Sequence, residues 1–220
     1  MHEGERVVIV SPHPDDEILG CGGLISRLNS KNKELFIIFL TKGENSTTEI
    51  DKEDLISERM RLTFQAAGIV GQPYSNIHYL NFEDGRVGEQ DEENERLSSL
   101  INTIRPDTVY VTHRLEGWND HYMAFELTRE IVKESEIRLF EYCVWLWYKT
   151  QLKDLLKIGI KNVHSIKLSA KENSDKRAAI AVYLDTKNDK GVSYSGALPR
   201  FLREYSSKER ELYFLVNKSI

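Results

Sequence analysis

The stretch Ser11-Pro12-His13-Pro14-Asp15-Asp16-Glu17 decides the fold, because a predicted strand enters it and a predicted helix leaves it. Before it, Val7-Val8-Ile9-Val10 is a β-branched run typical of a strand buried on both faces. After it, Ile18–Leu28 carries apolar residues at helical spacing. Two prolines stiffen the turn between them, which holds an imidazole and three carboxylates. Such a rigid turn suits a metal site, since its ligands converge without a large ordering cost.

The rest of the chain continues this alternation of strands and helices. Further strands are predicted at Glu34–Leu40, Ile77–Leu80, Thr108–Thr112, Leu139–Tyr148, Val163–Leu168 and Glu211–Val216. Further helices are predicted at Asp54–Ala67 with Gly68 as its C-cap, and at Asp91–Ile104, Tyr122–Lys133 and Ala170–Leu184. This order predicts an α/β, Rossmann-like three-layer fold with a mostly parallel sheet and helices on both faces. The length of 220 residues favours a single domain over 1–220.

Polar side chains follow several of the predicted strands. The residues that follow a predicted strand are His13, Asp16, Thr41, Asp84, His113 and His121. Ligands bind at the carboxyl ends of the strands in sheets of this kind, so we expect these side chains to gather on one edge.

The composition and net charge indicate which kinds of protein this sequence can encode. With 40% hydrophobic and 30% charged residues, the chain is an ordinary globular protein, and its net charge of −5 argues against a nucleic-acid partner. No apolar run approaches the ~20 residues that cross a bilayer, and no signal-peptide pattern begins the sequence. Cys21 and Cys143 form no disulfide framework. We therefore expect a cytoplasmic protein with no transmembrane segment, and the composition is compatible with a homo-oligomer.

The residues also carry a family resemblance. Pro12-His13-Pro14-Asp15-Asp16-Glu17 after the first strand resembles the signature of the PIG-L/LmbE-like zinc-dependent de-N-acetylases. Phe82-Glu83-Asp84-Gly85 resembles that family's Asp–Gly loop, and Arg105-Pro106-Asp107 leads into a strand as in the family. Asn119-Asp120-His121 follows that strand, where the family has its second metal-binding segment. The resemblance implies a hydrolase that removes acyl groups from N-acylated amino sugars or glycoconjugates with Zn²⁺.

The chemistry of these side chains agrees with that implication. Catalytic zinc takes three His or carboxylate ligands and leaves one coordination position for water. His13, Asp16 and His121 can supply these three ligands. A base must take a proton from water and return it to the amine, and Asp15 is the candidate. The resemblance assigns the same ligands and the same base. Asp120 fits the shell behind the ligands, where a carboxylate orients a ligating imidazole.

A second interpretation of the signature needs no metal. His13 can be a capped turn residue, and Asp15 and Asp16 an N-cap pair, since both residue types favour that position. Gly20-Cys21-Gly22-Gly23 lies within the predicted helix and lacks the spacing of a dinucleotide fingerprint, so close packing of the helix on the sheet explains it better.

The chain departs from the family at two positions. Trp118 stands where many members have a histidine thought to stabilise the oxyanion, and Glu116 stands where some have tyrosine or aspartate. Help for the oxyanion must then come from the metal, from His113 or from another residue. Trp118 either stacks on a sugar ring or packs into the neighbouring core. Arg59 and Arg61 are candidates for contact with sugar or phosphate.

The sequence thus predicts a zinc hydrolase that cleaves an N-acyl group, most often acetyl, from an amino sugar or its conjugate. The first alternative is an amidase of the same fold that acts on a non-sugar amide. The second is a catalytically silent protein that binds a metal or a sugar.

Overall fold

A seven-stranded, mostly parallel sheet forms the centre of the molecule. The computed structural model describes residues 3–149 and 162–217. The strands, in the spatial order β3-β2-β1-β4-β5-β7-β6, are β1 (Arg6–Ser11), β2 (Glu34–Phe39), β3 (Ile77–Tyr79), β4 (Thr108–Thr112), β5 (Arg138–Tyr142), β6 (Val163–Lys167) and β7 (Arg210–Leu215). The first five run parallel, whereas β7 is antiparallel to both β5 and β6. The predicted α/β fold with a mostly parallel sheet is confirmed.

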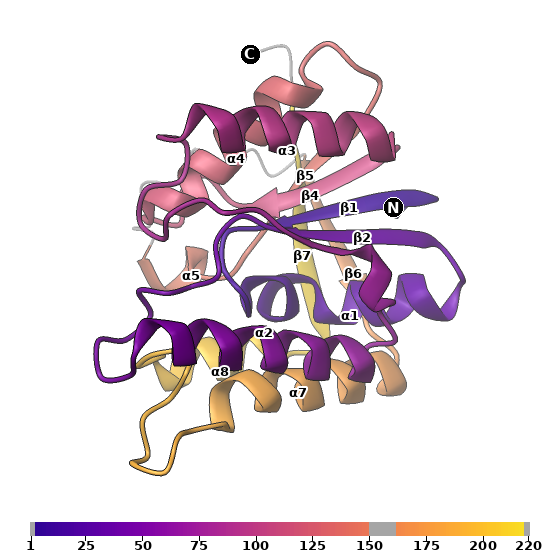
Figure 1. The fold of residues 1–220 in the computed structure, drawn as a ribbon. Helices are drawn as coiled ribbons and strands as arrows, with labels where there is room; N and C mark the ends of the chain where they lie inside the picture. The colour runs from indigo at the N-terminus through magenta and orange to yellow at the C-terminus, as the bar shows by residue number, and fades with distance from the viewer. Residues whose placement is uncertain (1–2, 150–161, 218–220) are drawn as a thin grey trace.

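Helices cover both faces of this sheet, as Figure 1 shows. In chain order they are α1 (Asp16–Ser30), α2 (Lys52–Ile69), the 3₁₀ turn η1 (Tyr74–Asn76), α3 (Asp91–Ile104), α4 (Asn119–Val132), α5 (Leu146–Lys149), α7 (Ala170–Asp185) and α8 (Arg200–Ser206). The helices α3 and α4 lie on one face, and α1, α2 and α7 lie on the other (Figure 1).

The strand β1 is buried on both faces, as its β-branched run predicts. Val7 and Ile9 belong to the core beneath α1 and α2, while Val8 and Val10 belong to the core beneath α3 and α4. Successive side chains of a strand point to opposite faces, so one run of four residues contributes to both cores.

The glycines of α1 serve close packing, as expected. A Cβ at Gly20 would overlap the ring of Tyr142, and one at Gly23 would overlap the side chain of Leu168. The helix therefore lies so near the sheet that only glycine fits at these two positions.

Several predicted boundaries are wrong, and the helix predicted at Tyr122–Lys133, for example, begins at Asn119. The predicted strand Leu139–Tyr148 ends at Tyr142, because the carboxylate of Glu116 accepts hydrogen bonds from the backbone N–H groups of Val144 and Trp145 and draws the chain out of the sheet. Gly68 is not a C-cap but lies inside α2, which continues to Ile69.

Two expectations drawn from the composition concern the cysteines and the possible membrane spans. Cys21 and Cys143 are both free and buried. Within residues 3–149 and 162–217, no helix combines the length and the apolar character that a membrane span requires.

Candidate metal centre

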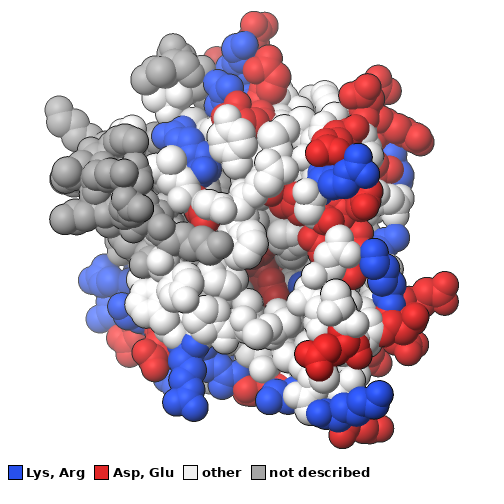
Figure 2. Space-filling model, turned by 90° about the vertical axis from the view of Figure 1, so that its left-hand side faces the viewer, with Lys and Arg blue, Asp and Glu red and all other residues white. Residues whose placement is uncertain are grey.

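The predicted site residues meet at the carboxyl ends of the parallel strands, the edge that faces the viewer in Figure 2. His13 and Asp16 follow β1, and His121 lies in the first turn of α4, which follows β4. Carboxylates are visible at the bottom of a hollow in the middle of this face, and mostly uncharged side chains surround its mouth (Figure 2). Topology alone brings together residues that lie more than a hundred positions apart in the sequence.

His13, Asp16 and His121 form one cluster of metal-ligating groups. The carboxylate oxygen Oδ2 of Asp16 lies 3.2 Å from Nδ1 of His13 and 3.3 Å from Nε2 of His121. One ligand atom from each residue lies within 4.8 Å of the others. Asp16 and His121 are almost fully buried, so the cluster is held rigidly.

A second acidic group faces the other nitrogen of His13. The Nε2 atom of His13 lies 3.1 Å from Oδ2 of Asp120 and 3.2 Å from Oδ1 of Asp84. The Asp120 carboxylate also accepts backbone N–H groups from Gly85 (2.7 Å) and Val87 (3.2 Å). Asp120 therefore contacts the imidazole of His13 and fixes the loop that carries Asp84.

The imidazole of His121 has a different partner, Glu116. The Nδ1 atom of His121 lies 2.7 Å from Oε2 of Glu116, whose side chain is fully buried. The sequence marked Glu116 only as a departure from the family pattern. A carboxylate five residues before the predicted ligand was the signal for this role.

The electrostatics of the cluster favour a bound cation. Burial opposes a charge on His121, but Asp16 and Glu116 outweigh it and raise the pKa of this imidazole to about 9. Burial likewise opposes a charge on His13, and its hydrogen bonds to Asp120 and Asp16 still raise its pKa well above the ordinary value. The same two histidines lower the pKa of the Asp16 carboxyl in spite of its burial. Two imidazole nitrogens and one carboxylate oxygen in an excess of negative charge fit zinc.

Asp15 lies beside this cluster with an unusual backbone. Its φ is 113° and its ψ is −32°, and its side chain makes no capping hydrogen bond although it precedes α1. Burial raises the pKa of the Asp15 carboxyl to about 6; the nearby Arg59 opposes the rise, and Asp16 adds to it. The N-cap interpretation thus lacks its hydrogen bond at Asp15, and this carboxyl titrates near neutral pH.

Glu17 supports this turn from within the core. Its Oε2 accepts the backbone N–H of Asp15 (2.9 Å), and its Oε1 accepts the hydroxyl of Tyr183 (2.8 Å). Burial raises the pKa of the Glu17 carboxyl to about 8. Glu17 therefore stabilises the turn from within the core.

A cavity of about 440 Å³ opens above the cluster. Of the predicted substrate-contacting residues, Arg59, Asp84 and Trp118 line it. Asn45, Trp145 and Ser195 line it as well and were not predicted, because no motif marks the segments that carry them.

Two of the predicted contacts differ in detail from expectation. The guanidinium of Arg59 is buried and donates to the carbonyl oxygens of Tyr194 (2.7 Å) and Pro14, with Asp15 Oδ2 at 3.4 Å. Arg59 thus braces the wall of the cavity. His113 is not brought to the cavity: it is buried against Phe214, and burial lowers its pKa to about 3.

Trp118 lies at the mouth of the cavity. Its side chain is 44% exposed, and its ring meets that of Trp145 edge to face, with the centroids 5.7 Å apart. The ring of Trp118 therefore packs on Trp145 and is also exposed at the mouth of the cavity.

Comparisons with known proteins agree with this geometry. Residues 8–132 match the family model described as PIG-L, GlcNAc-PI de-N-acetylase. A diacetylchitobiose deacetylase of Thermococcus kodakarensis is 30% identical over 133 residues, which cover 58% of this chain and 49% of that protein. A 1D-myo-inositol 2-acetamido-2-deoxy-alpha-D-glucopyranoside deacetylase of Actinosynnema mirum is 25% identical over 164 residues, 61% of this chain and 58% of that protein. The matched part thus spans about half of each of these relatives.

The fold is shared with a solved structure as well. The N,N′-diacetylchitobiose deacetylase from Pyrococcus horikoshii superposes with a TM-score of 0.73 at 18% identity, over 98% of this chain and 85% of that one. At this identity the likeness concerns the fold.

Proposed function

The chain belongs to the PIG-L, GlcNAc-PI de-N-acetylase family, and we propose that it is a zinc-dependent hydrolase that removes an N-acyl group, above all N-acetyl, from an amino sugar or its conjugate. The observation that carries the proposal is the convergence of His13, Asp16 and His121 on one buried point with Asp15 beside it. Both curated relatives named above are deacetylases of N-acetylated sugars by name, which supports the substrate class.

His13, Asp16 and His121 would hold the zinc ion. When bound, zinc supplies a Lewis acid for the amide carbonyl and lowers the pKa of water to about 7. Glu116 would accept a hydrogen bond from Nδ1–H of His121 and so leave Nε2 available as a ligand. Burial excludes bulk water from this group of charges and strengthens their interactions.

Asp15 would move the proton of the reaction. Its carboxylate accepts a proton from the attacking water as the new C–O bond forms. It then returns that proton to the amide nitrogen as the C–N bond breaks, which yields the free amine and the carboxylic acid. A pKa near 6 suits both steps at neutral pH.

The exposed ring of Trp118 would stack on the apolar face of the sugar at the mouth of the cavity. Asp84, whose carboxylate also lines the cavity, offers an acceptor for sugar hydroxyls.

The test compares Asp15→Asn with Asp16→Asn, a matched pair of identical substitutions on adjacent residues. Asp15→Asn should keep zinc and the fold but reduce kcat for acetate release from N-acetylglucosamine or N,N′-diacetylchitobiose by roughly 10²–10⁴-fold. Asp16→Asn should lose zinc affinity first, and added zinc should restore part of the rate.

Other outcomes separate the alternatives. If Asp15→Asn loses zinc while Asp16→Asn retains it, the two roles are reversed. Turnover of non-sugar amides alone would indicate the amidase, and zinc binding without turnover of any amide would indicate a silent binding protein.

A further inference from the structure

The proposed reaction places negative charge on the carbonyl oxygen of the amide as the new C–O bond forms. A fixed hydrogen-bond donor beside this oxygen lowers the barrier, in addition to what a metal contributes. His113, the candidate from the sequence, is buried against Phe214 and does not line the cavity. A protein donor for this oxygen therefore has to come from another group in the wall of the cavity.

Several donors in that wall already have acceptors. Asn45 donates to Asp84 from its backbone N–H (2.8 Å) and from its side-chain amide (2.6 Å). The backbone N–H of Gly85 donates to the carboxylate of Asp120 (2.7 Å). Each of these bonds holds the loop that carries Asp84, so a ligand that took one of these donors would loosen the site.

The guanidinium of Arg59 is likewise committed to the wall. Its Nη1 and Nη2 atoms donate to the carbonyl oxygens of Tyr194 and Pro14. Its Nε atom is buried, and Gly43 packs so closely on it that a Cβ atom there would overlap this nitrogen. Arg59 therefore serves the wall of the cavity, as its burial also indicates.

Ser195 contributes a hydroxyl to the same wall. Its side chain is 5% exposed and lines the cavity together with Asp15, Asp16 and His121. The hydroxyl forms no hydrogen bond of standard geometry with residues 3–149 and 162–217. It nevertheless lies near Asp15: burial raises the pKa of that carboxyl, and the Ser195 hydroxyl is close enough to oppose the rise. A buried hydroxyl that the fold leaves unsatisfied is suited to a ligand that completes it.

The backbone on both sides of Ser195 is fixed. The carbonyl oxygen of Tyr194 accepts from the hydroxyl of Ser46 (2.9 Å) and from Nη1 of Arg59 (2.7 Å). Gly196, with a φ of 70°, lies so close to the backbone carbonyl of Ser46 that a Cβ atom would overlap it. The position of the Ser195 hydroxyl is thus set before a substrate binds, which is what makes a donor effective in a transition state.

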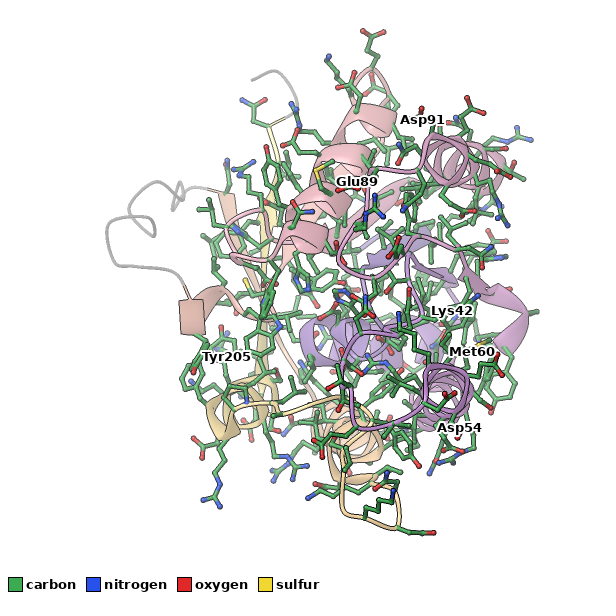
Figure 3. All side chains as sticks on the ribbon, turned by 60° about the vertical axis from the view of Figure 1, so that its left-hand side comes forward. Lys42, Asp54, Met60, Glu89, Asp91 and Tyr205 are labelled. Atoms are coloured by element: carbon green, nitrogen blue, oxygen red, sulfur yellow. The ribbon has the colours of Figure 1, made fainter. Side chains whose placement is uncertain are left out.

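We infer that the hydroxyl of Ser195 donates a hydrogen bond to the amide carbonyl oxygen as negative charge develops on it, and is therefore a further catalytic residue. This inference rests on the proposed function. Ser195 lies in the segment that joins α7 to α8, the helix of the labelled Tyr205 in Figure 3. That segment lies outside residues 8–132, which match the family model, so a later part of the chain completes the site.

Two competing assignments predict different results. If Ser195 instead donates to the carboxylate of Asp15, its loss raises the pKa of the base and shifts the acidic limb of the pH–rate profile to higher pH. If the donor is Asn119, an exposed amide that also lines the cavity, the effect follows Asn119→Ala.

The kinetic test uses the zinc-loaded, full-length protein and the variant Ser195→Ala, with Ser206→Ala as the matched control. The Ser206 side chain is 3% exposed, and its hydroxyl also lacks a partner in the described part of the chain, but it does not line the cavity. Ser195→Ala should reduce kcat for acetate release from N,N′-diacetylchitobiose roughly 10²–10³-fold, the effect of removing one oxyanion donor. KM, zinc affinity and the acidic limb should not change, and Ser206→Ala should behave as the wild-type protein.

A second measurement needs no turnover. The methylphosphonamidate of glucosamine carries tetrahedral oxygens in place of the acetyl carbonyl and so mimics the developing oxyanion, whereas glucosamine lacks that group. In calorimetric titration of the zinc-loaded proteins, Ser195→Ala should bind the phosphonamidate roughly 10–100-fold more weakly than the wild-type protein, as for the loss of one hydrogen bond to a charged group. Both proteins should bind glucosamine equally well, and Asn119→Ala should keep its affinity for the phosphonamidate.

Four results would overturn the inference. They are an unchanged kcat in Ser195→Ala; a shifted acidic limb with unchanged affinity for the phosphonamidate; loss of that affinity in Asn119→Ala but not in Ser195→Ala; and marked destabilisation of Ser195→Ala in urea, which would show that the hydroxyl is bonded within the fold.

Failure of the proposed function is distinguishable from failure of this inference. If the wild-type protein releases no acetate from any sugar, the proposed function fails, and the phosphonamidate titration decides the role of Ser195 separately. Weaker binding by Ser195→Ala then supports the assignment, whereas equal affinity, or no binding by either protein, overturns it.

Discussion

Replacing Glu116 by glutamine separates the hydrogen bond to His121 from the packing of the surrounding loop. In the wild-type protein, Oε1 of Glu116 accepts the N–H groups of Val144 and Trp145, and Oε2 lies 2.7 Å from Nδ1 of His121. A glutamine that keeps its oxygen on the loop turns its NH₂ group towards Nδ1. That nitrogen must then accept, so the proton moves to Nε2, the nitrogen that faces Asp16 and would bind zinc. We expect zinc affinity to fall ~10–100-fold.

Alanine at the same position is the matched control for the loop. It leaves the N–H of buried Val144 and of half-buried Trp145 without an acceptor. At about 1–3 kcal/mol for each buried donor, and less where water can reach, the free energy of unfolding should fall by about 2–4 kcal/mol. Glu116→Gln satisfies both donors and should lose far less.

Three measurements separate these effects. Competition with a chromophoric chelator gives zinc affinity, urea denaturation gives the free energy of unfolding, and ¹⁵N NMR of the imidazole gives the tautomer of His121. The reasoning is refuted if Glu116→Gln binds zinc as tightly as the wild-type protein with the proton still on Nδ1.

Three further changes test other parts of the structure. Trp118→Ala should raise KM for every sugar substrate and leave zinc affinity unchanged; unaltered KM and kcat for all sugars would exclude stacking. Burial raises the pKa of Glu141 from 4.5 to about 7. The stability gained by binding this proton in the folded state is therefore fully present below pH 4.5 and is lost as the pH rises through 7. Glu141→Gln should remove this loss of about 3 kcal/mol, seen as a smaller difference between urea denaturation at low and at high pH, and parallel curves for the two proteins would contradict it. Asp15→Gly should be more stable than Asp15→Ala by about 1–3 kcal/mol, because the backbone at this position favours glycine, and both should lack turnover; equal denaturation midpoints would show that no strain is stored there.

Much of the fold could be predicted because hydrophobic patterns report burial directly. Alternate residues of Val7–Val10 enter two cores, and that requirement is visible in the sequence as an unbroken β-branched run. The strand predicted at Leu139–Tyr148 was too long because the same kind of hydrophobic pattern was its basis. Apart from Glu141 the run is apolar, but Glu116 accepts hydrogen bonds from the backbone of its last part, and a pattern within the run carries no sign of so distant an acceptor.

The site could be predicted where topology brings residues together. His13, Asp16 and His121 follow parallel strands, so any such sheet places them on one edge. Ser195 and Asn45 could not be predicted, since they come from loops without a motif. Asn45 donates its backbone N–H to Asp84, and Ser195 follows Tyr194, whose carbonyl accepts from Ser46 and Arg59.

The backbone of Asp15 explains how two adjacent, chemically identical carboxylates come to occupy different surroundings. At φ 113° the chain turns so that Asp16 meets the two imidazoles, while the carboxylate of Asp15 faces the guanidinium of Arg59. A non-glycine residue in such a conformation costs about 1–3 kcal/mol and persists only where the surroundings over-determine it. Here they do: the N–H of Asp15 is held by Glu17, and its carbonyl accepts the N–H of Leu19 at 2.9 Å. The strain therefore lies between Asp16, which we propose binds the metal, and Asp15, which we propose exchanges the proton.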